Sequence, residues 1–340
     1  MLDAGHTSFY TYADGQRMVY DPQSKGYKPA SDSDRVINIA DIRRTRGVLA
    51  ENDSASLLDM GDGVLLLEFH TKMNALDTAI GEIANVAIER IHAGATGLVI
   101  GNQGGNFSAG ANLFLIGMLA QAGQWDQMDE AIHGLQQMIL QMRLAPAPVV
   151  AAPYQLALGG GAEVSMGADR IVAHAELYMG LVEVGVGLLP GGGGCKEMVR
   201  RRVSPHMHAD NVNPSPYLQQ IFEQIGFAKV STSALEARDM GFLADTDRVV
   251  MNYDHLLAEA KNEVLRMAEA GYTPPNVKGN VYAAGADQLA NLRVGIHMLK
   301  EGGYISEHDA VIADELAKVL CGGELSAPAW MDEQYFLDLE

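Results

Sequence analysis

The chain has 340 residues, of which 48% are hydrophobic and 20% are charged, as is usual for a globular protein with a sizeable core. Its formal net charge of −19 argues against a nucleic-acid partner and against docking on an anionic membrane, because both attract basic protein surfaces. The uncharged run 144–162 contains three prolines and three glycines, which argues against a membrane-spanning helix there. We therefore expect no membrane insertion, and an anionic ligand would need a local site.

The cysteines and the N-terminus indicate the compartment. Only two cysteines occur, Cys195 and Cys321, so there is no disulfide framework and a reducing compartment is the simpler interpretation. The first residues, MLDAGHTSFYTYADGQ, lack the basic and apolar regions of a secretory signal. We predict a cytoplasmic location.

Residues 1–55 are polar and contain several turn-forming pairs. Four tyrosines, at positions 10, 12, 20 and 27, indicate that this segment packs against another part of the protein. We expect a polar N-terminal extension or a connector between domains.

Strand and helix patterns alternate after this segment and continue to about residue 190, which indicates an α/β fold. Six elements are expected in order: a strand at 64–70, an amphipathic helix at 77–93, a buried strand at 96–104, helices at 111–122 and 125–143, and a proline-bounded strand at 146–153.

The remainder of the chain is mostly helical in pattern. The segment 204–216 is expected to be an inserted loop, and Ser306 with Asp309 predicts a capping pair for the last long helix. Helical patterns occupy 217–230, 232–242, 255–270 and 306–320.

We predict three parts: the N-terminal extension 1–55, a catalytic α/β domain 56–270 with the insertion 204–216, and a helical region 271–340. The last residues, DEQYFLDLE, follow a helical pattern without a cap signal, which indicates a cut through a longer polypeptide.

Two glycine runs resemble nucleotide-binding loops but lack decisive residues. GLLPGGGGCKE (187–197) has no GK[ST], so a phosphate-binding loop of that class is excluded. GVGLLP (185–190) lacks the third glycine of the dinucleotide fingerprint. We predict no NAD site in this chain.

Two other clusters carry a functional and a structural interpretation. His206 and His208 have a spacing that can hold a metal, but no third ligand lies nearby in sequence, which favours a solvated loop and no metal. Arg200, Arg201 and Arg202 can bind phosphates, although their place at a helix end favours a charge cluster there.

Two small-residue loops can present free backbone N–H groups. GGGAEVSMGAD (159–169) and NFSAGANL (106–113) each lead from a strand end into a helix, where main-chain donors face outward. Glu163 lies on the first turn of the first helix, and Glu183 is a second glutamate in apolar, glycine-rich surroundings. The alternative is that the glycines only permit tight packing and that Glu163 caps its helix.

Four motifs occur in the order and spacing typical of the crotonase superfamily: NAL within KMNALD (72–77), FSAGANL (107–113), 148–173 and 179–194. Residues 230–243 fit that family's next helix, so the resemblance covers about 60–265. It implies an α/β fold, a crotonase-like ββα spiral with a helical C-terminal region. More closely, the chain resembles the enoyl-CoA hydratase part of bifunctional 3-hydroxyacyl-CoA dehydrogenases of fatty-acid β-oxidation, as a fragment of the longer chain.

The resemblance also implies roles for individual residues. The oxyanion hole for the thioester oxygen would be the N–H groups of Ala111 and Gly160. The catalytic pair would be Glu163, mainly as base, and Glu183, as acid, although neighbouring carboxylates titrate as a coupled pair. Substrate-binding positions would be Lys72, Asn74, Ala75, Ala109, Gly110 and Gly161. Two positions depart from the common pattern, Asn112 where Asp is usual and Val182 where Pro is frequent.

The function implied is hydration of trans-2-enoyl-CoA to 3-hydroxyacyl-CoA. Retention of both glutamates favours it over an enoyl-CoA isomerase or related acyl-CoA reaction, and over a non-catalytic acyl-CoA-binding domain. No cofactor is expected in this chain beyond the CoA thioester substrate, and NAD would belong to a dehydrogenase part. The expected partners are acyl-CoA and either a homo-oligomer, such as a trimer, or a dehydrogenase domain.

Overall fold

The computed structural model describes residues 5–13, 16–30 and 35–340. A seven-stranded sheet forms the centre, in the order β12-β10-β8-β7-β6-β5-β4. The pairs from β6 to β12 are parallel, whereas β4, β5 and β6 are antiparallel neighbours. The strand bounds are β4 Val48–Glu51, β5 Ala55–Gly61, β6 Val64–Phe69, β7 Gly97–Ile100, β8 Val149–Ala151, β10 Arg170–His174 and β12 Arg248–Val250.

The central strands are buried on both faces, which explains their unbroken apolar sequences. Helix α2 (Thr78–His92) packs on β5 and β6, and α9 (Leu256–Glu269) packs on β7, β8 and β10. Asp77 caps α2 by accepting a hydrogen bond from the Ile80 N–H. Helix α4 (Trp125–Arg143) lies against α2 and extends towards the site described below.

A small parallel pair, β9 (Gln155–Leu158) and β11 (Leu177–Gly180), lies beside the large sheet. Helix α5 (Gly160–Gly167) begins directly after β9, and the short helix η3 (Glu183–Val186) follows β11. This pair therefore delivers Glu163 and Glu183 to one region of the molecule. The other short elements before β9 are η2 (Lys72–Asn74) and α3 (Leu113–Gln121).

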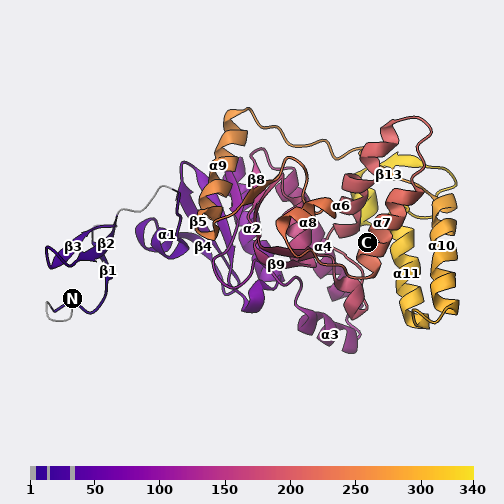
Figure 1. The fold of residues 1–340 in the computed structure, drawn as a ribbon, viewed down its shortest axis with the longest axis horizontal. Helices are drawn as coiled ribbons and strands as arrows, with labels where there is room; N and C mark the ends of the chain where they lie inside the picture. Colours follow the sequence, from indigo (N-terminus) through magenta and orange to yellow (C-terminus); the bar gives the residue numbers. More distant parts are fainter. Residues whose placement is uncertain (1–4, 14–15, 31–34) are drawn as a thin grey trace.

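The C-terminal part is a helical layer at one end of the molecule (Figure 1). Helices α10 (Ala286–Glu301) and α11 (Glu307–Leu320) pack together, and α11 also contacts α6 (Gly194–Arg202) and α7 (Ser215–Gly226). The predicted capping pair is confirmed, because Ser306 and Asp309 form a reciprocal capping box. The other elements after η3, apart from β12 and α9 given above, are η4 (Ser204–His208), α8 (Ala234–Asp239), η5 (Tyr253–His255), β13 (Val281–Ala283), β14 (Ala329–Met331) and α12 (Glu333–Leu337).

At the opposite end lies a three-stranded antiparallel sheet of β1 (Tyr10–Ala13), β2 (Gln16–Asp21) and β3 (Gly26–Pro29) (Figure 1). It is tied to α1 (Ile39–Thr45) through Asp41, which accepts a hydrogen bond from the Tyr12 hydroxyl and pairs with Arg17 at 3.2 Å. Tyr12 contacts α1, Tyr10 lies under the Arg17 guanidinium, and Tyr20 and Tyr27 pack on each other, so these contacts lie within residues 1–55. Strand β4 also falls within 1–55 and pairs with the main sheet.

The chain after residue 217 is mostly helical, as expected, and it also contains three strands of three residues each, β12, β13 and β14. The expected loop 204–216 contains the 3₁₀ helix η4, and its histidines stack on rings rather than standing free: His206 on Tyr217 at 4.1 Å and His208 on Trp330 at 4.4 Å between ring centroids.

Within the described part of the chain, no helix is both long and apolar enough to cross a membrane. The same residues contain no group of three or more side chains placed to hold a metal ion.

The buried side chain of Asn102 connects β6 to the loop that follows β7, and its replacement tests how much this connection stabilises the fold. Its buried side chain accepts from the Phe69 N–H at 2.7 Å and donates to the Phe107 carbonyl at 2.7 Å. We expect Asn102→Ala to lower the free energy of unfolding by about 2–4 kcal/mol, because two buried main-chain groups lose their partners. Urea unfolding measures this, with the exposed Asn291→Ala as the control. An Asn102→Ala variant as stable as the control would contradict it.

Candidate active site

The site is built on two turns that require glycine. Gly110 has φ 90° and Gly159 has φ 52°, in the left-handed region that side chains other than glycine rarely adopt. A Cβ on Gly110 would also lie 2.7 Å from the Leu158 carbonyl oxygen. The two turns therefore lie in contact, and each directs the next residue's N–H.

The amides that follow these turns are Ala111 N and Gly160 N. A Cβ on Gly110 would lie 3.2 Å from Gly160 N, and one on Gly160 would lie 3.5 Å from Ala111 N, so the two amides are close together. Neither N–H donates a hydrogen bond to any group of the described residues. Gly160 is also the first residue of α5, where the helix dipole favours negative charge. Such a pair of free donors can hold an oxygen that gains negative charge.

The predicted residues of the 72–76 segment support the Ala111 loop. The Leu76 N–H donates to the Gly110 carbonyl at 2.8 Å, and the Ser108 hydroxyl donates to the Asn74 carbonyl at 2.8 Å. The Asn74 side chain donates to the Asn106 carbonyl at 2.9 Å, so it holds the loop. Asn112, the departure from the common pattern, caps α3 by accepting from the Leu115 N–H at 3.3 Å.

The other predicted substrate-binding positions lie at the same turns. Ala75 and Ala109 are half-buried beside them, and Ala109 N–H donates to the Met73 carbonyl at 3.1 Å. Gly161 is packed so closely that a Cβ there would lie 2.8 Å from the Ser108 side chain. Lys72 is exposed, and it forms no ion pair with the carboxylates that the structure describes.

Glu163 is held by the glycine run 191–194. Its side chain is 3% exposed, and Oε1 accepts from the N–H groups of Gly192 at 2.8 Å and Gly194 at 2.9 Å. A Cβ on Gly192 would lie 2.6 Å from Oε2 of the same carboxylate. The run thus binds a carboxylate of its own chain, and the glycines leave the space for it.

Glu183 reaches the same region from η3. Its Oε2 atom is buried and has no hydrogen-bond partner among the described residues. Its Oε1 lies 2.8 Å from the position of a Cβ on Gly159, the residue that precedes the free Gly160 amide. The carboxyl group that carries the unpartnered oxygen therefore lies beside the turn that supplies one of the two donors.

The surroundings of the two glutamates shift the pKa values of their carboxyl groups to different extents. Burial raises the pKa of Glu183 to about 8, and the nearby charge of Glu163 adds to the rise. Burial also raises the pKa of Glu163, but the hydrogen bonds from Gly194 and Gly192 and the charge of Lys196 oppose the rise. At neutral pH the pair can thus hold one proton on Glu183, next to a carboxylate fixed by backbone amides.

An apolar cavity of about 490 Å³ adjoins the Ala111 turn. It lies between α2, α3 and α4, and its apolar lining includes Leu76, Ile80, Leu115, Leu119, Met128 and Met138. Helix α3 leaves Leu113, Phe114 and Met118 largely exposed. The arrangement combines polar donors at a turn with an adjoining space for an apolar group.

Comparison with known proteins agrees with this geometry. Residues 59–213 match the family model described as enoyl-CoA hydratase/isomerase. The chain carries a domain of the crotonase superfamily.

Solved structures show the same crotonase fold. An enoyl-CoA hydratase from Bacillus anthracis has a TM-score of 0.50 and 23% identity, with 78% of this chain and 89% of that chain covered. One from Bacillus halodurans has a TM-score of 0.52 and 18% identity, with 78% and 96% covered. At these identities the likeness shows the fold alone.

Curated relatives are much longer than this chain. A Bacillus subtilis protein named "Probable 3-hydroxyacyl-CoA dehydrogenase" is 42% identical over all 340 residues, which span 42% of its length. A Rickettsia felis protein named as a fatty acid oxidation complex trifunctional enzyme is 30% identical over 241 residues, 70% of this chain and 32% of that protein.

The crotonase domain has one site contact that sequence reasoning missed. The buried Glu340 carboxylate accepts from the N–H groups of Gly193 and Lys196, both at 2.6 Å, and so caps α6 next to Glu163. Burial and the charge of Glu163 raise the pKa of Glu340. No local pattern connects Glu340 with the glycine run, because the contact forms only in the folded chain.

The titration of Glu183 should appear in stability measurements on the crotonase domain. Between its ordinary pKa of 4.5 and the folded value of about 8, the folded protein keeps a proton that the unfolded chain loses, so this contribution to stability falls as pH rises. We expect Glu183→Gln, which cannot ionise, to gain stability relative to wild type by up to about 1.4 kcal/mol per pH unit across this window.

Urea unfolding of both proteins at several pH values measures that difference. The exposed Glu176→Gln serves as the control and should keep a nearly constant offset from wild type. A constant offset for Glu183→Gln as well would show that Glu183 ionises normally.

Proposed function

We propose that this crotonase domain hydrates trans-2-enoyl-CoA to 3-hydroxyacyl-CoA. The observation that carries the proposal is the meeting of two glutamates with different environments beside two free amides at the adjoining Gly110 and Gly159 turns. An isomerase or a non-catalytic acyl-CoA-binding domain would need the amides but not the second glutamate.

The amides of Ala111 and Gly160 would hold the thioester oxygen. When water adds across the C2–C3 double bond, negative charge collects on that oxygen in an enolate-like transition state. Donors already fixed at a helix start and a strained turn need no rearrangement to stabilise the charge. Each contributes about 3 kcal/mol to lowering the barrier.

The glutamates would divide the proton transfers. Glu163, whose carboxylate accepts from Gly192 and Gly194, takes a proton from water while the water oxygen bonds to C3. Glu183, protonated near neutral pH, delivers a proton to C2. Water loses one proton to Glu163, and C2 gains one proton from Glu183, so the product gains the elements of one water. The pair still holds one proton, which is now on Glu163 instead of Glu183.

The apolar cavity beside Ala111 would take the acyl chain. Its lining offers hydrophobic side chains from three helices, and its volume of about 490 Å³ exceeds what a four-carbon acyl group fills. We therefore expect the domain to accept acyl chains longer than crotonyl.

The longer relatives give this reaction a context. Hydration produces a 3-hydroxyacyl-CoA, the substrate class in the name of the Bacillus subtilis relative. We propose that the domain works beside a dehydrogenase part that binds NAD. The crotonase domain itself needs only the CoA thioester.

The direct test compares loss of the enoyl thioester chromophore for wild type, Glu163→Gln and Glu183→Gln with crotonyl-CoA and decenoyl-CoA. Each variant should lose at least about a hundredfold in kcat, because each removes one proton transfer. Glu176→Gln, on the exposed strand connection, is the matched control. Full activity in either glutamine variant would contradict the two-glutamate mechanism, and isomerised product in place of 3-hydroxyacyl-CoA would favour the alternative reaction.

Chain-length selection can be tested at Gly134, which lines the apolar cavity on α4 and whose Cβ would meet no atom within 4 Å. We expect Gly134→Phe to fill the cavity and lower kcat/KM for decenoyl-CoA by about tenfold or more, with crotonyl-CoA little affected. Gly295→Phe on α10 is the control, because a Cβ there also meets open space and the residue lies outside the cavity. Equal losses for both substrates would place the acyl chain elsewhere.

A further inference from the structure

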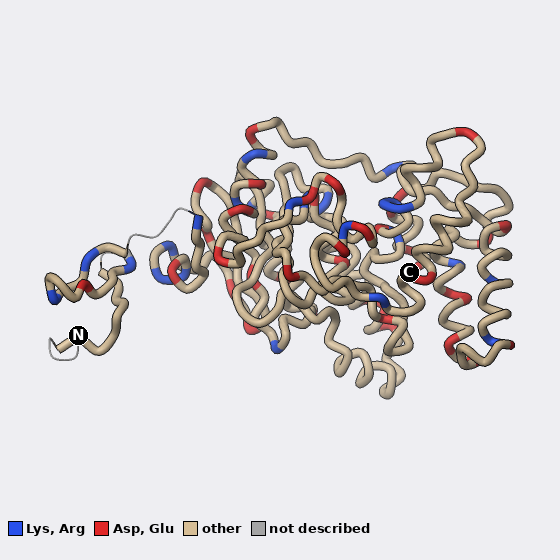
Figure 2. Tube along the Cα trace, in the orientation of Figure 1, with Lys and Arg blue, Asp and Glu red and all other residues tan. Residues whose placement is uncertain are grey.

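A second cavity, of about 660 Å³, is lined by six arginines: Arg143, Arg170, Arg200, Arg201, Arg202 and Arg238. The whole chain has 24 lysines and arginines against 43 acidic residues, and the acidic residues are spread along nearly all of its length (Figure 2). A quarter of the basic residues thus meet in one hollow of an acidic protein.

This cavity is separate from the crotonase active site. It shares no lining residue with the apolar cavity or with the two glycine turns. It includes Ala168 and Asp169, directly after α5, whose first residue supplies the Gly160 amide. Eight helical residues span about 12 Å, so α5 separates the two places.

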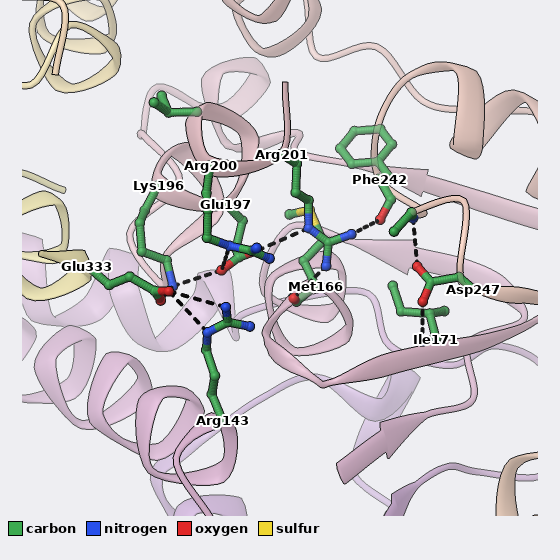
Figure 3. Close-up of polar contacts among 12 residues, drawn as sticks. Arg143, Met166, Ile171, Lys196, Glu197, Arg200, Arg201, Phe242, Asp247 and Glu333 are labelled. Carbon is green, nitrogen blue, oxygen red and sulfur yellow. Dashed lines mark hydrogen bonds and ion pairs between the residues drawn. The ribbon is translucent and has the colours of Figure 1, made fainter. Parts of the chain in front are cut away.

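Three of these arginines, Arg143, Arg200 and Arg201, also belong to a buried ion network (Figure 3). Among the described residues, Glu333 and Glu197 are the carboxylates within ion-pair distance of its cations. Glu333 pairs with Arg143 at 3.2 Å and with Lys196 at 2.8 Å. Glu197 pairs with Lys196 at 2.9 Å, Arg200 at 2.6 Å and Arg201 at 3.0 Å. Four positive side chains therefore share two negative ones.

Glu197 stays ionised in this setting. Burial alone would raise its pKa, but the charges of Arg200 and Lys196 hold the pKa of Glu197 well below its usual range. Lys196 also interacts with the charges of Glu163 and Glu340, and Arg201 with that of Asp247, so the positive charge of the network is shared with these groups as well. Lys196 and Arg201 are only 2% and 10% exposed, so water screens their charges little.

Three further arginines at the cavity donate hydrogen bonds to neutral groups, and Arg170 also interacts with the charges of Asp169 and Asp247. Arg170 donates to the Asp169 carbonyl, Arg202 to the Gln220 side-chain oxygen at 3.3 Å, and Arg238 to the Asp247 carbonyl at 2.8 Å. The Nε of Arg238 is buried and has no partner there. Guanidinium donors therefore remain free for a ligand.

The aspartates at the cavity do not cancel this charge fully. Asp169 accepts a hydrogen bond from the Val149 N–H, and Asp247 accepts from the N–H groups of Ile171 and Ala244. The carboxylate oxygens of both residues are therefore hydrogen-bonded to the main chain. Burial raises the pKa of both carboxyls. Asp245 is exposed at the rim. Counting all of these as ionised, three aspartates stand against six arginines in the lining of the cavity.

We propose that this arginine cavity is a binding site for a small phosphate-bearing anion other than the acyl-CoA substrate. Planar guanidinium groups bind phosphate oxygens through paired, charge-assisted hydrogen bonds, which suits a ligand with two or three acidic oxygens. The cavity is larger than one inorganic phosphate, so a diphosphate or a phosphorylated metabolite fits its chemistry. Arg170, Arg202 and Arg238, whose hydrogen bonds go to neutral groups, would supply the guanidinium donors for the anion.

The test is calorimetric titration of the protein with inorganic pyrophosphate at constant ionic strength, without acyl-CoA. Wild type should bind saturably, and Arg170→Gln and Arg202→Gln should each weaken binding by about tenfold or more. Neither residue forms an ion pair in the described structure, so both variants should fold, which circular dichroism checks. Arg266→Gln is the matched control, because this exposed arginine pairs only with Glu263 and lies outside the cavity.

A second arm separates the two sources of phosphate. Saturating coenzyme A should leave pyrophosphate binding unchanged if the cavity is independent of the acyl-CoA site. The proposal is overturned by the absence of saturable binding up to about 10 mM, by variants that bind as wild type does, or by competition from coenzyme A. None of these readings depends on hydratase activity.

Discussion

The candidate active site depends on how a buried carboxylate is compensated. Glu163 lies in an apolar interior, where an isolated ion would be strongly disfavoured, and two main-chain N–H groups compensate it. That solution demands glycine at 192 and 194, because a Cβ at either position would lie within 2.9 Å of the carboxylate. The same absence of side chains at Gly110 and Gly159 brings the two donor turns together.

Helix α6 connects this chemistry to the rest of the fold. Its start presents amides to Glu163 and Glu340, and its last turn presents three arginines to the second cavity. Lys196, in between, joins α6 to α12 by pairing with Glu333, and it also pairs with Glu197. One short helix therefore orders the Glu163 carboxylate, the C-terminal segment and a cluster of positive charge.

Sequence patterns predicted the parts of the fold that depend on local periodicity. The apolar run at 64–70 and the amphipathic pattern at 77–93 became β6 and α2 because each encodes a buried face without help from distant residues. Strands β12 to β14 escaped prediction because three residues carry too little pattern, and their pairing partners are remote in sequence.

The site was predictable for a different reason. The order of the motifs identified four candidate residues, Ala111, Gly160, Glu163 and Glu183, and the structure places their turns together. The contacts of Glu340 and Glu333 could not be inferred, since a carboxylate near the end of a helical pattern looks like any solvated one. The role of the glycine run 191–194 was also not predicted: its amides donate hydrogen bonds to the Glu163 carboxylate.

The Glu340 cap has a consequence for the dynamics of the domain. If the segment after β14 detaches in a local opening, the amides of Gly193 and Lys196 lose their acceptor, and Gln136 loses its bond to the Leu337 carbonyl while it still holds Gly191. Detachment of this segment and fraying of the first turn of α6 would then form one cooperative unit. The geometry around Glu163 would be as persistent as the docking of residues 333–340, although these residues touch no reacting atom.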